Sequence, residues 1–231
     1  MQNNEKENFG EKINNFVQKN RKGIFAVFGL FILLFIGLIV YFLVSDHLNK
    51  QAIAEVEILN EEFEKLRFGL SDDYYAGEVN ALLAKLEDFT GNKKGFAESK
   101  AWSMIGHIHS AKKQWRQAEE AWVKSADTGA RTYLGPIAFF NAAACAEEQG
   151  KIEQAIEYLQ QSISHRFEFP DAPRAQFNIG RLYEQLGNYA EALTAYRAVL
   201  INYSWESSDS NQNMLIWQNL ARNQIIKLET R

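Results

Sequence analysis

The sequence predicts an all-α protein, in which a single N-terminal transmembrane helix precedes an α-solenoid of about three helical hairpins with capping helices. Three observations support this fold class. Residues 23–44 form one uninterrupted apolar run, the alanines Ala118, Ala155 and Ala192 recur at intervals of 37 residues, and helix-stop and helix-start signals recur with them. The run suits lipid, and a fixed period of this length is typical of stacked pairs of helices.

The apolar run contains no charged residue and no proline. At about 1.5 Å per residue, a helix of this length spans about 33 Å, which matches the roughly 30 Å hydrocarbon core of a bilayer. The run is longer than the apolar part of a secretory signal peptide, and Leu43, Val44 and Ser45 at its end offer no small-x-small cleavage pattern. We therefore expect residues 23–44 to be an uncleaved anchor in the lipid bilayer.

Basic residues are concentrated on the amino-terminal side of this run. Lys50 alone follows the run within about 20 residues, whereas five basic residues precede it: Lys6, Lys12, Lys19, Arg21 and Lys22. Segments rich in Lys and Arg remain in the cytoplasm when a helix inserts. We expect a single-pass protein of the inner (cytoplasmic) membrane, with a cytoplasmic N-terminus and a periplasmic or otherwise extracytoplasmic C-terminal domain.

Charge and cysteine content narrow the function classes. The formal net charge is −4, and residues 1–22 are net basic whereas the remainder is acidic. No concentrated basic face follows the run, so we expect no nucleic-acid partner. With one cysteine, Cys145, the chain can form neither an intramolecular disulfide nor a thiolate zinc cluster. Because alanines flank Cys145, we expect a small buried apolar residue there.

An internal repeat occupies the centre of the chain. Each copy has a bulky residue, an apolar–small pair, a residue at the aromatic position, the signature alanine and a second bulky residue. The copies are Trp102, Ile105, Gly106, His109, Ala118 and Trp122; Phe139, Ala142, Ala143, Ala146, Ala155 and Leu159; and Gln176, Ile179, Gly180, Tyr183, Ala192 and Tyr196. This spacing predicts a helical hairpin in each copy, whose first helix lies close against its second at the small residue.

Stop and start signals agree with this division. Gly150 and Gly187 are placed to end the first helices of two hairpins, because glycine readily adopts the left-handed conformation at a helix C-terminus. Pro136 and Pro173 suit the first turn of a following helix, where a missing N–H has no intrahelical acceptor.

These motifs resemble the tetratricopeptide repeat superfamily over about residues 99–204, and the third unit, residues 175–193, carries the best match. The resemblance implies an α-solenoid of tetratricopeptide hairpins that binds protein partners. The order of cytoplasmic tail, single anchor, juxtamembrane helix and small repeat domain is similar to the ancillary tetratricopeptide subunit of the Sec translocon. That similarity implies a translocon or periplasmic chaperone as partner, and a role in protein translocation, chaperone recruitment or envelope assembly.

The expected organisation is a cytoplasmic tail (1–22), the transmembrane helix (23–44), a juxtamembrane helix with a degenerate first hairpin (45–98), the repeats (99–204) and a C-terminal capping helix (205–231). Within the third segment, an apolar stripe comprises Ala52, Val56, Leu59, Phe63 and Leu66. It fits either packing against the repeats or the seam of a coiled-coil dimer. In the tail, Phe9, Ile13, Phe16 and Val17 fit either a helix in the headgroup region or a disordered segment.

The first helix of each unit lines the concave groove of such a solenoid. The groove residues that we expect to bind a partner peptide are Lys100, Ser103, His107, Ile137, Phe140, Asn141, Arg174, Phe177 and Arg181. Phe140 and Phe177 would anchor an apolar segment, or else pack inside the stack. The three cations would meet acidic groups or a terminal carboxylate. In the chaperone-tail family of these repeats, Asn141 and Arg174 match carboxylate-binding positions, whereas Ser103, His107 and Asn178 depart from them.

No motif indicates catalysis. The chain has no Gly-x-Ser-x-Gly, no phosphate-binding glycine loop and no His-Glu-x-x-His, and His107 and His109 point in different directions from one helix. We expect no enzyme, no catalytic residue, no cofactor and no metal. The sequence favours a membrane-anchored interaction scaffold. The alternative is a structural component that forms a homo-oligomer through the stripe containing Ala52 or through the ends of the repeats.

Overall fold

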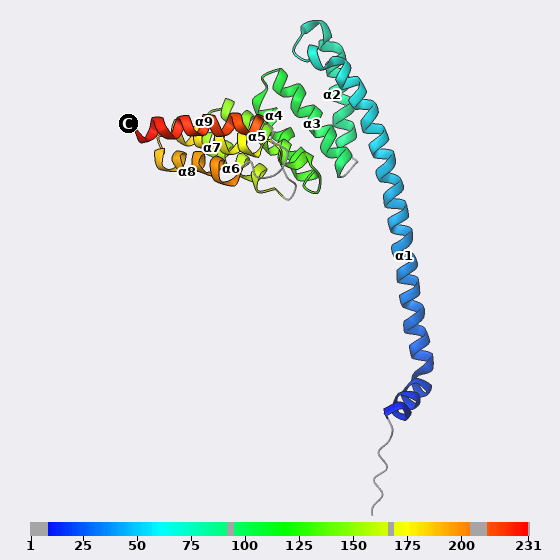
Figure 1. The fold of residues 1–231 in the computed structure, drawn as a ribbon. Helices are drawn as coiled ribbons and strands as arrows, with labels where there is room; N and C mark the ends of the chain where they lie inside the picture. The colour runs from blue at the N-terminus through cyan, green and yellow to red at the C-terminus, as the bar shows by residue number, and fades with distance from the viewer. Residues whose placement is uncertain (1–8, 92–94, 166–168, 204–211, 231) are drawn as a thin grey trace, which may run out of the picture. The chain divides into compact units, whose positions relative to one another are not determined.

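The structure is a computed structural model that describes residues 9–91, 95–165, 169–203 and 212–230 (Figure 1). All regular secondary structure in these ranges is helical. The chain divides into two compact units, Met1–Gln51 and Ala52–Arg231.

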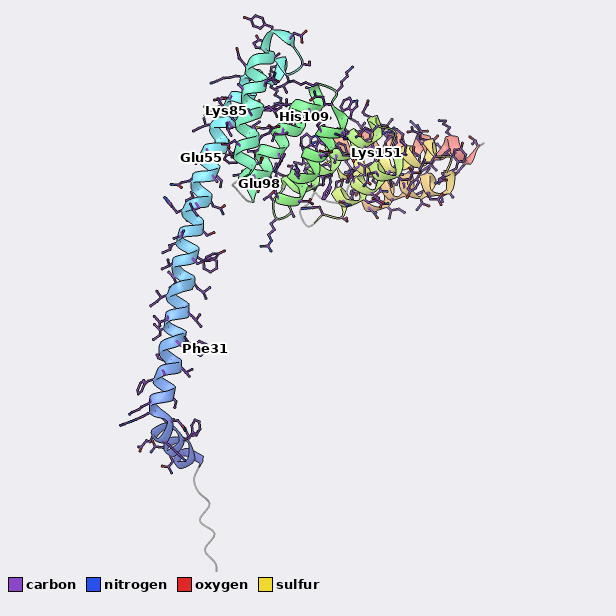
Figure 2. All side chains as sticks on the ribbon, turned by 180° about the vertical axis from the view of Figure 1, so that it is seen from behind. Phe31, Glu55, Lys85, Glu98, His109 and Lys151 are labelled. Carbon is purple, nitrogen blue, oxygen red and sulfur yellow. The ribbon has the colours of Figure 1, made fainter. Side chains whose placement is uncertain are left out.

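The first unit consists of the amino-terminal part of helix α1 (Phe9–Leu66). This helix is unbroken at both boundaries expected for the transmembrane segment, after residues 22 and 44. Its most apolar window of 18 residues has a mean hydropathy of 3.0, and 0% of that window is buried. The ring of Phe31, for example, projects freely from the helix (Figure 2). Among the described residues, one apolar helix, near the N-terminus, is therefore long enough to cross a membrane.

The tail before this window is helical from Phe9 onward, and the side chains of Ile13, Phe16 and Val17 are exposed. This favours the helical interpretation for the described part of the tail. Residues 1–8 lie outside the described ranges.

The second unit is a stack of helices (Figure 1). The last turns of α1 lead through two short 3₁₀ helices, η1 (Arg67–Gly69) and η2 (Asp73–Tyr75), into α2 (Ala76–Thr90). Three hairpins follow: α3 (Phe96–Ala111) with α4 (Trp115–Thr128), α5 (Leu134–Glu148) with α6 (Ile152–Ile163), and α7 (Ala172–Gln185) with α8 (Tyr189–Asn202). Helix α9 (Gln212–Glu229) packs against the last of them. Each helix from α2 to α9 contacts the next along the chain, as expected for a solenoid.

Turns within the hairpins use the left-handed conformation. Gly150 and Gly187 have φ values of 74° and 78°, which confirms their predicted role at the ends of the first helices. The equivalent residue of the first hairpin is Lys113, which has a φ of 56° although it carries a side chain. Pro173 is the second residue of α7 and Pro136 the third of α5, so both lie in first turns as predicted.

The small residues of the repeat lie where the two helices of a hairpin pack closely, as predicted. Ala118, Ala155 and Ala192 are fully buried. The residue that lies over Gly106 is Trp122, four positions beyond the signature alanine, and a Cβ at Gly106 would lie 2.7 Å from its indole. The glycine is thus required by an aromatic ring on the second helix, rather than by the alanine alone.

The apolar stripe at the end of α1 is covered by its own chain. Ala52, Val56, Phe63 and Leu66 are buried in one cluster with side chains of α2 and α3, among them Leu82. The interpretation as packing against the helical stack is therefore confirmed, and these side chains are not free to form a coiled-coil seam.

At the other end of the stack, α9 covers the third hairpin. Trp217, Ala221 and Ile225 pack against Phe177 and Val199, which confirms the predicted capping helix. Four of its apolar side chains nevertheless remain exposed: Leu215, Ile216, Leu220 and Ile226. The turn-rich loop predicted before this helix lies, for residues 204–211, outside the described ranges.

Candidate functional site: the face of the first helices

The residues expected to bind a partner lie on the first helices of the three hairpins, α3, α5 and α7. We call this surface the first-helix face. It comprises Lys100, Ser103 and His107 on α3, Ile137, Phe140 and Asn141 on α5, and Arg174, Phe177 and Arg181 on α7. The nine residues differ in what their side chains contact, and this difference decides which of them are available to a partner.

On α3, the positive charge is already paired. The Nζ atom of Lys100 lies 2.8 Å from both carboxylate oxygens of Glu57, which extends from α1. The side chain of Lys100 is only 21% exposed. A partner carboxylate would therefore have to displace Glu57, whereas Ser103 is half-buried on the same helix.

His107 lies between two aromatic rings. Its imidazole is 5.9 Å from the ring of Phe63 on α1 and 4.7 Å from the ring of Trp122 on α4, the latter edge to face. Part of the residue remains exposed, yet its surroundings exclude enough water to lower the pKa of the imidazole below its ordinary value. The positive charge of Arg67 lowers this pKa further, and Glu64 opposes the effect. The neutral ring acts here mainly as a packing element.

On α5, Ile137 and Phe140 are half-buried and pack against the cluster shared by the second and third hairpins. The ring of Phe140 lies 5.4 Å from that of Phe169, which comes just before α7. Asn141 is half-buried. Phe140 therefore has one face in the stack and remains partly accessible.

On α7, Phe177 belongs to the interior. It is 8% exposed, and its ring lies 5.2 Å from that of Tyr196 and 5.4 Å from that of Trp217. Of the two alternatives predicted for this residue, the structure favours packing inside the stack, because α9 covers it. Phe177 cannot anchor a partner while α9 stays in place.

Arg181 connects two hairpins. Its two terminal nitrogens each donate to one carboxylate oxygen of Glu147 on α5, both at 2.6 Å. This bidentate hydrogen bonding raises the pKa of the guanidinium above its ordinary value. The pair positions α7 against α5, so the charge of Arg181 is largely neutralised.

Arg174 differs from the other two cations. Its side chain is exposed and forms no ion pair with any residue that the structure describes. The guanidinium carbon lies 5.0 Å from the centre of the Phe140 ring and 5.9 Å from that of Trp217. Two aromatic rings thus orient an accessible positive charge without neutralising it. Arg174 and Phe140 are the part of the first-helix face best suited to contact a partner.

Sequence reasoning missed the residues that decide this availability. Glu57 and Phe63 come from α1, and Trp217 comes from α9, which was expected only to cap the stack. The spacing of the repeats carries no information about helices outside it. The 37-residue period did place all three of Phe140, Arg174 and Arg181 on one set of helices.

Two further kinds of chemical site are a metal-binding cluster and the thiol of Cys145. Within the described ranges, no three His, Cys, Asp or Glu side chains lie close enough together to bind a metal ion. Cys145 is 3% exposed and packs with Ala118 and Trp122, in agreement with the expected buried apolar residue. Burial raises the pKa of its thiol, which suppresses the reactive thiolate.

Comparison with known proteins identifies the repeat family. A family model described as a tetratricopeptide repeat matches residues 104–165 and 146–204. A "TPR repeat-containing protein" of Treponema pallidum (strain Nichols) is 36% identical over 169 residues, which cover 67% of this chain and 70% of that protein.

Solved structures share the fold. A crystal structure of nearly identical TPR-like repeats, assigned to a kinesin light chain of Podosopora anserina, has a TM-score of 0.53 at 16% identity, over 76% of this chain and 91% of that one. A second crystal structure of these repeats has a TM-score of 0.52 over 76% and 92% of the two chains. The stacked hairpins, the repeat motif and the identity to the treponemal protein lead to one conclusion: this chain belongs to the tetratricopeptide repeat proteins and is a scaffold for protein–protein interaction.

Proposed function

We propose that this chain is a membrane-anchored scaffold of the inner membrane, whose repeats hold a protein partner on the periplasmic or equivalent extracytoplasmic side. The observation that carries the proposal is the apolar run of α1, whose side chains stay exposed to their surroundings. Leaving so many apolar side chains in water is unfavourable, whereas a bilayer accommodates them. The basic residues before the run, such as Arg21 and Lys22, support a cytoplasmic N-terminus.

The partner that fits the first-helix face is an acidic segment with an apolar side chain beside the acidic group. Arg174 supplies a charge that has no ion-pair partner in the described part of the chain, and Phe140 supplies an apolar surface next to it. A translocon subunit, a periplasmic chaperone or an envelope assembly factor could present such a segment or its terminal carboxylate. Anchoring in the same membrane would raise the effective concentration of the partner, so a modest affinity suffices.

Membrane topology is tested with engineered cysteines in a Cys145→Ser background. Ser71→Cys and Asn14→Cys both place the thiol at an exposed position. A membrane-impermeant maleimide added to intact spheroplasts should label the first variant and leave the second unlabelled until the cells are lysed. Labelling of Asn14→Cys in intact spheroplasts would contradict the proposed orientation.

Partner binding is tested by photo-crosslinking in cells. A photoreactive amino acid at Ala144, which is exposed on α5, should crosslink a partner protein, and Arg174→Glu should abolish that product by reversing the available charge. The same photoreactive group at Glu120 of α4 serves as the matched control position. Crosslinked products that are identical at both positions, or unaffected by Arg174→Glu, would show that the partner does not bind the first-helix face.

A second candidate function is self-association as a structural component. The observation that favours it is the exposed apolar surface of α9, since a terminal helix normally presents a polar outer face. Sedimentation of the detergent-solubilised chain at several concentrations tests it. Concentration-dependent association that is lost in the Leu220→Lys, Ile226→Lys variant would support self-association over the scaffold alone.

A further inference from the structure

The second and third hairpins enclose an open apolar pocket, distinct from the first-helix face. It has a volume of about 570 Å³ and lies between α6, α7 and α8. Its walls include Gln160 and Ile163 of α6, Gln176 and Ile179 of α7, and Glu191 and Ala195 of α8. Binding sites for small molecules and side-chain clusters have volumes of this order.

The corresponding position between the first and second hairpins is filled by the chain itself. A shift of 37 residues relates Gln176 to Phe139 and Ala195 to Tyr158. Those two aromatic rings stack with centroids 6.3 Å apart and pack in a cluster with Val123 and Ala126. The phenol of Tyr158 donates a hydrogen bond of 3.2 Å to Glu119.

The pocket therefore results from two truncations in the third hairpin. Where the second hairpin has two aromatic rings, the third has an amide and a methyl group, and Gln176 Nε2 donates to the backbone oxygen of Ala195 at 3.3 Å. The remaining walls keep the apolar character of the filled site, since Ile163 and Ile179 occupy the positions of two alanines. The filled site shows that the geometry of this repeat accommodates an aromatic side chain, although Ile156 stands where Glu119 accepts the hydroxyl of Tyr158.

The charges around the pocket restrict the occupant further. Glu191 is part of its wall, and Glu153 and Glu157 continue the stripe of α6 on which Gln160 lies. Helix α6 contains no lysine or arginine. In α8 the single cation is Arg197, which is paired with Glu229 at 2.6 Å. The two cations of α7 are Arg181, which is paired with Glu147, and Arg174, which lies over the rings of Phe140 and Trp217. A segment that carries positive charge is therefore complementary to these walls, and an acidic one is repelled.

We propose that this pocket binds the aromatic side chain of a basic segment of a protein partner, with a tyrosine or phenylalanine ring in the place that Tyr158 fills one hairpin earlier. The site goes beyond the proposed function, because the first-helix face selects acidic segments and this pocket selects basic ones. A scaffold with both surfaces holds two different partners, or two segments of one partner, at the same time.

The test uses the full chain in nanodiscs of phosphatidylcholine, which carries no net charge to attract basic peptides. Three fluorescein-labelled peptides are compared by fluorescence anisotropy: Gly-Lys-Lys-Tyr-Lys-Lys-Gly, its Tyr-to-Ala analogue, and Gly-Glu-Glu-Tyr-Glu-Glu-Gly. The basic tyrosine peptide should bind at least about tenfold more tightly than either analogue, because the analogues lose the buried ring or the favourable charge. Empty nanodiscs provide the blank.

Two variants locate the binding. Gln176→Phe with Ala195→Tyr transplants the aromatic pair of the second hairpin and should abolish the tyrosine preference, while circular dichroism and thermal unfolding verify that the stack is folded. Glu191→Lys leaves the pocket open. It should weaken binding of the basic tyrosine peptide about threefold to tenfold and strengthen binding of the acidic peptide. Neither variant alters a residue of the first-helix face, so their effects separate this proposal from that surface.

The proposal is overturned if the tyrosine and alanine peptides bind equally to the wild-type chain. It is equally overturned if the folded transplant variant keeps the tyrosine preference, or if Glu191→Lys leaves the charge preference unchanged.

Discussion

Gly180 of α7 lies directly against the phenol ring of Tyr196 on α8. A Cβ on Gly180 would be 2.6 Å from a ring carbon of Tyr196, a separation shorter than real Cβ atoms adopt. The first hairpin repeats the relationship with Gly106 and Trp122. At the equivalent positions, the second hairpin has the larger Ala143 in place of glycine and the smaller Leu159 in place of the aromatic ring. The added volume on one helix is thus offset by the smaller side chain on the other.

Gly180→Ala should lower the free energy of unfolding by about 1–2 kcal/mol, because overpacking outweighs the higher helix propensity of alanine. In the double variant with Tyr196→Leu, which copies the second hairpin, the loss should be smaller than the sum of the two single losses. Urea unfolding followed by tryptophan fluorescence measures all four proteins. Additive losses would show that Gly180 and Tyr196 are not coupled.

Lys113→Gly should raise the free energy of unfolding by about 0.5–1 kcal/mol. Lys113 has a φ of 56°, and a left-handed conformation costs a residue with a side chain on the order of 1 kcal/mol. The matched control is Gly150→Ala, at the equivalent turn, which should be destabilising by a similar amount. Thermal unfolding of both variants checks the pair, and a stabilising Gly150→Ala would contradict this explanation of the turns.

Glu119→Ala should destabilise the stack by about 1.5–3 kcal/mol, because three hydrogen-bond donors lose the buried carboxylate that accepts from them. Its side chain accepts hydrogen bonds from Gln149 Nε2 at 2.7 Å, Lys151 Nζ at 2.8 Å and Tyr158 Oη at 3.2 Å. Figure 2 labels Lys151, one of these three donors, on the helical stack. Lys151→Met should cost less, since its side chain is 46% exposed and water can replace part of the contact.

The same hydrogen-bond network predicts a loss of folding stability at alkaline pH. Burial, then the charge of Glu119, raises the pKa of Tyr158 to about 12 from its ordinary value of 10.0. Its contribution to stability is therefore complete below pH 10 and is lost as the pH rises toward 12, because the unfolded chain releases the proton first. Urea unfolding between pH 9 and pH 12 should show a flatter decline for Tyr158→Phe than for the wild type. Equal slopes would contradict the assignment.

The titration of His107 predicts a loss of folding stability at low pH, whereas that of Tyr158 predicts a loss at high pH. Burial lowers the pKa of its imidazole below the ordinary value of 6.5, so the folded state resists protonation and the unfolded state does not. Its contribution is present above pH 6.5 and is lost as the pH falls through the lowered pKa. Relative to wild type, His107→Gln should unfold with a weaker dependence on pH below 6.5. Ser103→Ala, on the same helix, controls for small changes in packing.

The periodicity of the chain was sufficient to predict the hairpins and their ends. The fixed interval of 37 residues can be read directly from the sequence. The positions of glycine at the turns and of proline in the first turns follow from local backbone chemistry. For the same reason it placed Phe140 and Arg174 on one face. It could not tell that Phe177 is covered and Arg181 neutralised, because Trp217 and Glu147 reach them from other helices.

The pocket between α6, α7 and α8 is a second feature that the sequence alone could not predict. Ala195 and Gln176 are visible in the sequence as departures from Tyr158 and Phe139. Only the packed helices reveal that, among the described residues, no other side chain fills the space. The sequence by itself determined the apolar N-terminal helix, the repeat family and the helix order, since these depend on composition and on contacts close along the chain. The tertiary structure alone decided which charges and rings remain available to a partner, because burial and pairing depend on neighbours that are distant along the chain.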